Sequence, residues 1–403
     1  MDLFRPQKPY IFRPPKYARW FRPILYLLTS SIMRYRFNIR RVQIRGQENL
    51  VQLVKNGQSV LVAPNHADHA DPVLLVTVGR RLGLAFHFMA AREGFERGVL
   101  HRFVLQRSGA FSVDRDGADL ASIRTAMNIL RRGQHPLVIF PEGEIWHHHE
   151  ELDLLNEGVA TILLRVAEKL PKGKRSFAIP TAIHITHSPS EADTFSERIA
   201  RLEQRITWKP KTSLEVVDRI YHLGGALLSI KEEEFLGVAQ QGDLVDRIKN
   251  LQKHLVRQIE QKHDHISNGQ PIPLRLKALR HMIRRELHSD PPPSAARHEE
   301  LYDELDQLYV AQQLYSYPGQ YLIRQPTLDR IAETILKLEE DVMEIESYPT
   351  PRYAEVIFGD PIDVRLVLED LKLNAKNGVR PMTELLREQI QKLSANGGQS
   401  PGQ

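Results

Sequence analysis

Between residues 41 and 185, short apolar runs of β type alternate with stretches whose apolar residues recur at helical spacing. The β-like runs are residues 42–44, 59–63, 86–89, 110–113, 137–140 and 177–185. Helical stripes at 120–130 and 155–170 lie between them. Such alternation is typical of an α/β fold, in which helices cover a central, mostly parallel sheet. In such a sheet the site is expected at the ends of the strands.

Past residue 190 the pattern changes to long polar helices. Apolar stripes at 244–259 and 276–287 predict two helices of a few turns each. Residues 299–346 then hold twelve acids against three bases, which predicts a separate acidic helical segment. A β-rich run returns at 352–364, ahead of a terminal helix around 383–393. The chain is therefore expected to combine an α/β domain with a helical C-terminal extension.

Two pairs of elements could close the sheet, because a β-rich run precedes a helix twice. One pair is 213–221 with the helix at 244–259, and the other is the returning run at 352–364 with the terminal helix. The Gly-rich tail from residue 396 is expected to be frayed. The expected organisation is a basic aromatic segment at 1–40, the α/β domain at 41–265, the helical acidic extension at 266–350, and the returning strand and terminal helix at 351–395.

The N-terminal segment is strongly basic and aromatic. Residues 1–45 carry eleven Lys or Arg against one acid, Asp2, although the whole chain has a net charge of +5. Nine aromatic residues are interleaved with these cations: Phe4, Tyr10, Phe12, Tyr17, Trp20, Phe21, Tyr26, Tyr35 and Phe37. The longest low-charge run, residues 24–33, is shorter than the roughly 20 apolar residues that cross a bilayer. We therefore expect a peripheral or monotopic membrane segment on an anionic surface.

Two other interpretations of this segment were compared with the membrane hypothesis. It could be a helix packed on the body with a solvated basic face, because basic amphipathic stretches are common. Nucleic acid is not the expected partner, because no recognised nucleic-acid module follows the basic arm.

The chain contains no cysteine. This excludes disulfides, cysteine-ligated metal clusters and any mechanism with an enzyme thiol as nucleophile. No apolar stretch long enough for a secretory signal opens the sequence. We therefore expect thiol-free chemistry on the cytoplasmic side.

The most distinctive local feature is the β-like run 59–63, which leads into His66 and Asp71. On a continuous helix these two residues would lie about 140° apart, so they meet only if a turn lies between them. Asp71 followed by Pro72 is a favourable helix start, which predicts that turn. Asp71 could be a cap and nothing more. In the functional interpretation, one carboxylate oxygen caps the helix while the other accepts from His66. An imidazole oriented in this way can deprotonate a hydroxyl, here the substrate's, because no serine or cysteine nucleophile is evident beside it.

The same cluster contains residue types that bind metals. His66, Asp68, His69 and Asp71 do not reproduce the ligand spacings of known zinc or calcium motifs, and residues 147–149 form a bare histidine run. A metal hydrolase is therefore the weaker hypothesis, and no metal is expected.

Two further candidate sites follow predicted strands. The run 110–113 leads into Arg115, whose planar guanidinium suits a phosphate. The run 137–140 leads into a Pro-Glu-Gly turn with Glu142 and Gly143. Each feature alone is as common in surface turns and salt bridges as in sites.

Taken in order, these blocks resemble the glycerolipid acyltransferase family that includes 1-acylglycerol-3-phosphate acyltransferase. The matching residues are Asn65, His66 and Asp71 for N-H-x4-D, Gly109, Phe111 and Arg115 for the glycine-to-arginine block, residues 140–143 for F-P-E-G, and Ile179, Pro180 and Thr181 for an apolar strand with proline. The resemblance covers residues 41 to about 220.

The resemblance implies a fatty acyl transfer from a thioester to a hydroxyl of a lyso-glycerolipid. It implies that His66 is the general base and that Asp71 orients it. Gly109, Arg115, Glu142 and Gly143 would help to bind the acceptor. The donor would be acyl-CoA or acyl carrier protein, with no bound cofactor, and membrane lipids would be partners.

This sequence departs from the family pattern after the third block. The family usually continues Thr-Arg-Ser after the glycine, whereas here the sequence reads Glu144, Ile145, Trp146. A negative charge at Glu144 would repel a phosphate, which weakens the assignment of 1-acylglycerol-3-phosphate as acceptor. Asp68 also stands where a small hydroxyl residue is often found. The alternative is a catalytically impaired member that acts as a lipid-binding or scaffolding protein, which the intact His66 and Asp71 disfavour.

Overall fold

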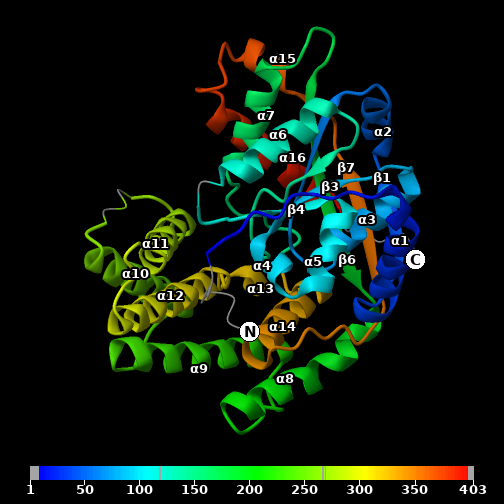
Figure 1. Cartoon of the computed structure of the whole chain (residues 1–403). Helices are drawn as coiled ribbons and strands as arrows, with labels where there is room; N and C mark the ends of the chain where they lie inside the picture. The colour runs from blue at the N-terminus through cyan, green and yellow to red at the C-terminus, as the bar shows by residue number, and fades with distance from the viewer. Residues whose placement is uncertain (1–8, 118, 266, 268, 398–403) are drawn as a thin grey trace. The chain divides into compact units, whose positions relative to one another are not determined.

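The computed structural model describes residues 9–117, 119–265, 267 and 269–397 and contains two compact units (Figure 1). The sheet unit contains Phe12–Asp114, Asp119–Pro189 and the described residues from Tyr348 onward. The helical unit is built mainly from Ser190–Ser347 and also includes the described residues from Arg115 to 117. The predictions that rest on Asp2, Phe4 and the tail beyond residue 397 lie outside the described residues.

The described residues of the sheet unit form one eight-stranded sheet. Its order is β1 (Ile39–Arg45), β7 (Arg352–Phe358), β6 (Ser176–His187), β2 (Ser59–Pro64), β5 (Leu137–Val138), β3 (His87–Ala91) and β4 (Ala110–Val113), with β8 (Ile362–Asp363) paired to β6. The strands from β6 to β4 are parallel, whereas β7 and β8 run antiparallel to β6. The predicted α/β fold with a mostly parallel sheet and a helical extension is confirmed.

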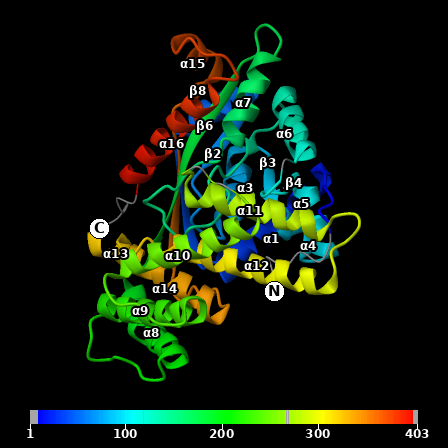
Figure 2. The same cartoon turned by 90° about the vertical axis from the view of Figure 1, so that its left-hand side faces the viewer.

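Helices cover both faces of this sheet because its central strands are apolar on both sides. Every residue of β2 is buried. Leu61 and Ala63 belong to the core on one face and Val60 and Val62 to the core on the other, as the two-residue repeat of a strand requires. Figure 2 shows α7 and α16 alongside β6. The first face is covered by α6 (Leu120–Arg132), α7 (Gly158–Glu168), α15 (Val364–Asp370) and α16 (Val379–Asn396), and the second by α2 (Gln47–Lys55) and α3 (Asp71–Leu82).

Three further helices of the sheet unit are α1 (Arg22–Ser31), α4 (Arg92–Glu96) and α5 (Val99–Ser108). Helix α1 buries Leu25, which packs with Phe21 against Val76 and Val104. Part of the basic N-terminal segment is therefore core, as the alternative interpretation expected. Among the described residues, no helix combines the length and the apolar character that crossing a membrane requires.

The helical unit has two apolar cores of its own. Its helices are α8 (Ala192–Ile206), α9 (Val216–Leu236), α10 (Leu244–Lys262), α11 (Ile272–Leu287), α12 (Ala295–Tyr315), α13 (Tyr321–Arg324) and α14 (Leu328–Met343). Helices α9 to α12 enclose one core, and α8, α9, α13 and α14 enclose the other. The expected boundary between residues 265 and 266 falls between α10 and α11, which share a core, so it does not coincide with a boundary of the compact units.

The structure decides which pair closes the sheet. Strands β7 and β8 occupy the returning run 352–364, and α16 follows as the terminal helix. The prediction that 213–221 could be a strand was wrong, because most of this run forms the first turns of α9. Ile220 and Leu223 of α9 pack with α8 and α14 at helical spacing. This packing outweighs the β-branched residues of the run.

Candidate active site

The chain leaves the sheet at the carboxyl end of β2 through Asn65, whose buried side chain extends the pairing to β6. Its Oδ1 accepts from the backbone N–H of Ile183 at 2.7 Å, and its Nδ2 donates to the carbonyl of Ile183 at 3.1 Å. The Asn65 backbone N–H donates to the carbonyl of Thr181 at 3.3 Å. The amide thus takes the place of a backbone peptide group and fixes where the next residue, His66, leaves the sheet.

His66 and Asp71 meet across the turn that their spacing requires. His66 Nδ1 and Asp71 Oδ2 are 3.0 Å apart. The same Oδ2 accepts from the backbone N–H groups of Ala67 and Asp68, each at 3.0 Å. The Asp71 side chain is fully buried, whereas the His66 side chain keeps 14% of its surface exposed. A buried carboxylate with three donors on one oxygen holds the imidazole firmly while leaving its outer edge accessible.

One detail of the predicted turn was wrong. Asp71 is the first residue of α3, and the N-cap position belongs to Ala70, which makes no capping bond through its side chain. Asp71 Oδ2 takes all three hydrogen bonds, and no described residue hydrogen-bonds Oδ1. The tight turn directs the N–H groups of Ala67 and Asp68 toward the carboxylate, so the oxygen that binds His66 also closes the turn.

This contact fixes the tautomer of His66. With Nδ1–H donating to Asp71, the lone pair of Nε2 is available to accept a proton, and no described residue hydrogen-bonds Nε2. The imidazole is stacked on Phe140, with ring centroids 4.0 Å apart and an interplanar angle of 25°. Phe140 belongs to the F-P-E-G block, so the first and third blocks meet at this ring.

Glu142 also connects the F-P-E-G block with the N-H-x4-D block. Its Oε1 accepts from the backbone N–H of His66 at 2.8 Å, and its Oε2 accepts from the backbone N–H of Asp153 at 3.1 Å. Burial raises the pKa of Glu142 to about 8, and the carboxylates of Asp153 and Asp71 add to this rise, while the two N–H donors partly offset it. Because both oxygens are used inside the protein, Glu142 is built to hold the His66 backbone.

Gly143 closes the turn that carries Glu142. Its N–H donates to the carbonyl of Phe140 at 3.2 Å, and its φ of +78° is favourable for glycine. A Cβ atom here would lie 2.7 Å from Nδ2 of Asn156. That amide donates to the carbonyls of Pro141 at 3.2 Å and Glu142 at 2.9 Å, so the turn and Asn156 fit only without a side chain at Gly143.

The two remaining acceptor candidates are Gly109 and Arg115. Gly109 ends α5 with a φ of +98°, and its carbonyl accepts from His87 Nδ1 at 2.7 Å. It precedes β4 and therefore lies at the amino edge of the parallel strands, whereas His66 follows a carboxyl end. Arg115 follows the carboxyl end of β4, in a segment that belongs to the helical unit. The structure thus brings His66, Asp71, Glu142 and Gly143 together, and acceptor binding by Gly109 and Arg115 stays a prediction.

Two residues of this region were not found from the sequence. Asn156 carries no motif, and only its place shortly after F-P-E-G could have drawn attention to it. Arg352 donates through Nη1 to Asp68 Oδ2 at 2.6 Å, although 284 residues separate them. No local spacing predicts a contact of that range.

The comparison with protein families fits this geometry. Residues 41–180 match the family model described as Acyltransferase. This segment contains β2, the His66 turn and the F-P-E-G turn. Residues 41–180 are therefore similar to an acyltransferase domain.

Part of the chain is also similar to a curated protein. The 1-acyl-sn-glycerol-3-phosphate acyltransferase of Streptococcus pneumoniae (strain ATCC BAA-255 / R6) is 28% identical to this chain over 109 residues. The similarity covers 27% of this chain and 38% of the relative, so the chain spans less than two fifths of the length of the curated relative that it matches.

Proposed function

We propose that this chain transfers a fatty acyl group from a thioester to a hydroxyl of a lyso-glycerolipid, with His66 as general base. The observation that carries the proposal is the 3.0 Å contact between His66 Nδ1 and the buried carboxylate of Asp71, within the segment that matches the acyltransferase family. It leaves Nε2 as the basic atom at the carboxyl edge of the sheet. A base held in this way contributes about 10²- to 10⁴-fold to the rate.

The proposed step needs no covalent enzyme intermediate. His66 Nε2 takes the proton of the acceptor hydroxyl as that oxygen attacks the thioester carbonyl. When the tetrahedral intermediate collapses, the C–S bond breaks and the imidazolium returns the proton to the departing thiolate. The products are an ester and a thiol, and Asp71 stabilises the imidazolium between the two proton transfers.

The acceptor is proposed to be a lysophospholipid, with 1-acylglycerol-3-phosphate as the first to test. Arg115 is the proposed ligand of its phosphate, since a guanidinium binds phosphate through two parallel hydrogen bonds. Glu142 and Gly143 act on the acceptor only through the position of His66. Glu144 follows them and disfavours a dianionic phosphate. The donor is acyl-CoA or acyl carrier protein, and we propose no bound cofactor.

The proposed work takes place at the cytoplasmic face of a membrane. Helix α1 and its neighbours expose Trp20, Leu27 and Tyr35, and α5 exposes Leu100. The ring of Phe103 on α5 lies 5.8 Å from the ring of Phe21, so the two helices adjoin. Exposed apolar residues beside cations are the composition of a segment that inserts among lipid headgroups.

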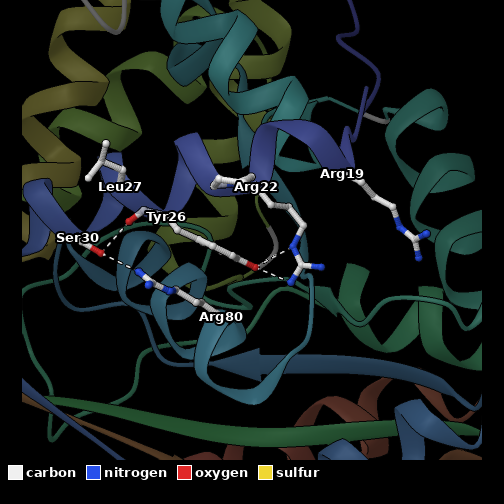
Figure 3. Close-up of a pocket in the computed structure, with 7 residues that line it drawn as sticks. Arg19, Arg22, Tyr26, Leu27, Ser30 and Arg80 are labelled. Carbon is white, nitrogen blue, oxygen red and sulfur yellow. Dashed lines mark hydrogen bonds between the residues drawn. The ribbon is translucent and has the colours of Figure 1, made fainter.

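A cationic pocket on α1 supports the same proposal. Its volume is about 780 Å³, and Figure 3 shows Arg22 and Arg80 on either side of Tyr26. Arg22 donates from Nε and Nη2 to the Tyr26 hydroxyl at 2.9 and 2.7 Å, and Arg80 Nη1 donates to Ser30 Oγ at 3.3 Å. Arginines fixed beside exposed apolar residues are suited to anionic headgroups.

The decisive experiment is an acyl-transfer assay of the purified protein on a panel of lyso-lipids with both donor types. We expect turnover with at least one acceptor and a loss of 10²-fold or more in His66→Ala, with little change in thermal stability. His222→Ala, an exposed histidine of α9, is the matched control. Lipid binding without turnover by the wild-type protein would instead favour the lipid-binding or scaffolding alternative.

A further inference from the structure

We propose that Arg352, the first residue of β7, is a positioning residue for His66 and acts through the buried carboxylate of Asp68. The role of His66 itself rests on the function proposed above. Arg352 lies outside the segment 41–180 that matches the family, so nothing in that match assigns it a role.

The direction of β7 brings Arg352 to the site. Strand β2 and strand β6 are parallel, and the His66 turn follows the carboxyl end of β2. Because β7 runs antiparallel to β6, its amino end lies at that same edge, where Arg352 pairs with His187 at the end of β6. Along β7 every second residue is buried, starting with Arg352. An arginine therefore enters the core at the level of the turn.

Every contact of this guanidinium is internal. Arg352 Nη1 donates to Asp68 Oδ2 at 2.6 Å, and Nε donates to the carbonyl of Phe37 at 3.0 Å. The guanidinium carbon lies 3.9 Å from the centre of the Tyr348 ring. The side chains of Arg352 and Asp68 are 1% and 3% exposed. Removing one partner of such a buried pair leaves the other charge uncompensated, which is far more costly than losing a surface pair.

Asp68 connects Arg352 to the turn that holds His66 and Asp71. Its Oδ1 accepts from the backbone N–H of Ala70 at 2.7 Å, while its own N–H donates to Asp71 Oδ2 at 3.0 Å. The Asp71 N–H donates in turn to the carbonyl of Asp68 at 3.1 Å. Burial alone would raise the pKa of Asp68, but the Arg352 guanidinium holds it below its usual range. The turn between His66 and Asp71 is thus built around a carboxylate that Arg352 neutralises.

Helix α16, which follows β7 and β8, also supports the loop that holds Glu142. On α16, Gln391 Oε1 accepts from the N–H of Leu152 at 3.0 Å, and its Nε2 donates to the carbonyl of Glu150 at 2.8 Å. The same loop contains Asp153, whose N–H holds Glu142. Strand β7 and helix α16 therefore both support the His66 site. Of the two supporting residues, Arg352 is charged, so its contribution can be tested by removing that charge.

The experiment uses Arg352→Gln, Asp68→Asn and the double variant in the full chain. Arg45→Gln is the matched control, because Arg45 pairs with Glu355 of the same strand β7 at 2.8 Å but on the exposed side. In protein labelled with ¹⁵N-histidine, the downfield Nδ1–H resonance of His66 reports the bond to Asp71, and its loss in His66→Gln assigns it. Circular dichroism and thermal unfolding establish that each variant is folded.

We expect Arg352→Gln to lose the His66 Nδ1–H resonance and to lower kcat/KM about 100-fold, as a small displacement of a catalytic group does. The double variant regains the resonance and at least tenfold of the activity, because no uncompensated charge remains. Arg45→Gln keeps the resonance and stays within twofold of the wild type. If Arg352→Gln does not fold, the double variant carries the test, and activity within threefold of Asp68→Asn supports the proposal.

A folded Arg352→Gln with an unchanged His66 resonance overturns the proposal, as does a double variant no better than Arg352→Gln. Wild-type protein that transfers no acyl group to any acceptor overturns the proposed function instead. In that case the resonance still decides the role of Arg352, because it is measured without substrate.

Discussion

The His66 turn and helix α1 belong to the same unit, and each departs from the usual rule that charged side chains are exposed and apolar side chains are buried. The turn buries charged side chains, whereas α1 and its flanks expose apolar ones. In the turn, Asp68 and Asp71 are buried and hydrogen-bonded. On and beside α1, Trp20 is 62% exposed, Leu27 70% and Tyr35 80%. The first region keeps charge away from water, and the second presents apolar surface to it. Each departure costs stability, so each marks a place where folding alone does not explain the sequence.

The two regions differ in how far a substitution affects neighbouring residues. In the turn each buried polar atom depends on another, so the loss of one leaves its partner unsatisfied. On α1 the exposed side chains act separately on the surface. Substitutions in the turn should therefore have large and coupled effects, whereas those on α1 should have small and additive effects.

The largest effect is expected for Asp71→Asn. The amide oxygen can take the place of Oδ2 and keep all three contacts, but it carries no negative charge to stabilise the imidazolium that forms on His66. We expect kcat to fall by about 10³-fold while the free energy of unfolding falls by only about 1–2 kcal/mol. Steady-state kinetics and urea unfolding of the same preparation measure both. A variant with more than a third of wild-type kcat would show that the base does not need the negative charge of Asp71.

The next effect is a change in the pH dependence of stability. The pKa of Glu142 is raised by burial from 4.5 to about 8 in the folded chain. Below pH 4.5 the carboxyl is neutral in both states. Between these values the unfolded chain releases a proton that the folded chain keeps, so stability falls as pH rises. Glutamine has no such proton, and the stability of Glu142→Gln relative to wild type should rise by about 2–4 kcal/mol from pH 5 to pH 8.

Urea unfolding at the two pH values measures this difference. The variant should start less stable at pH 5, by about 1 kcal/mol, because its NH₂ group cannot accept from the N–H of Asp153. Glu384→Gln, an exposed position on α16, should show no such trend. Parallel pH profiles for Glu142→Gln and wild type would mean that the buried carboxyl does not take up the proton.

The smallest effect is expected on α1 and its flanks. Deleting the segment would also remove core residues, so substitution of Trp20, Leu27 and Tyr35 by serine is the sharper test. We expect about tenfold weaker binding to vesicles that contain anionic phosphatidylglycerol, with turnover on a soluble short-chain acceptor unchanged. Serine at Val238 and Leu371, two exposed apolar residues elsewhere, is the control.

Salt separates the two contributions to this binding. At 1 M salt the Debye length is about 3 Å, so the electrostatic part is lost while apolar insertion remains. The wild type should then be partly released from anionic vesicles, and the triple serine variant almost completely. Equal binding of both proteins under all these conditions would place the membrane contact elsewhere.

The sequence predicted what depends on local patterns. Strand β4 was predicted at the residues where it lies, because a short apolar run flanked by polar residues has few alternatives. His66 and Asp71 were predicted to meet because only a turn between them satisfies their spacing. The contact of Arg352 with Asp68 was not predicted, since it depends on the antiparallel direction of β7. The run at 213–221 was misread because burial against α8 and α14, and not local propensity, decides its conformation.

The register of β1 gives the sheet a particular order of assembly during synthesis. Strand β1 is the first strand among the described residues, and within the described sheet it pairs only with β7, so Ile44 has no strand partner until Val356 has been made. At about 5–20 residues per second, the ribosome makes the intervening chain over tens of seconds. Until β7 is made, β1 has unpaired backbone groups, and so has the edge of β6 once that strand has been made; unpaired strand edges are prone to associate with other chains. Arg352, which neutralises Asp68, is part of the same strand, so the contacts that support the His66 turn are complete only after β7 has been made.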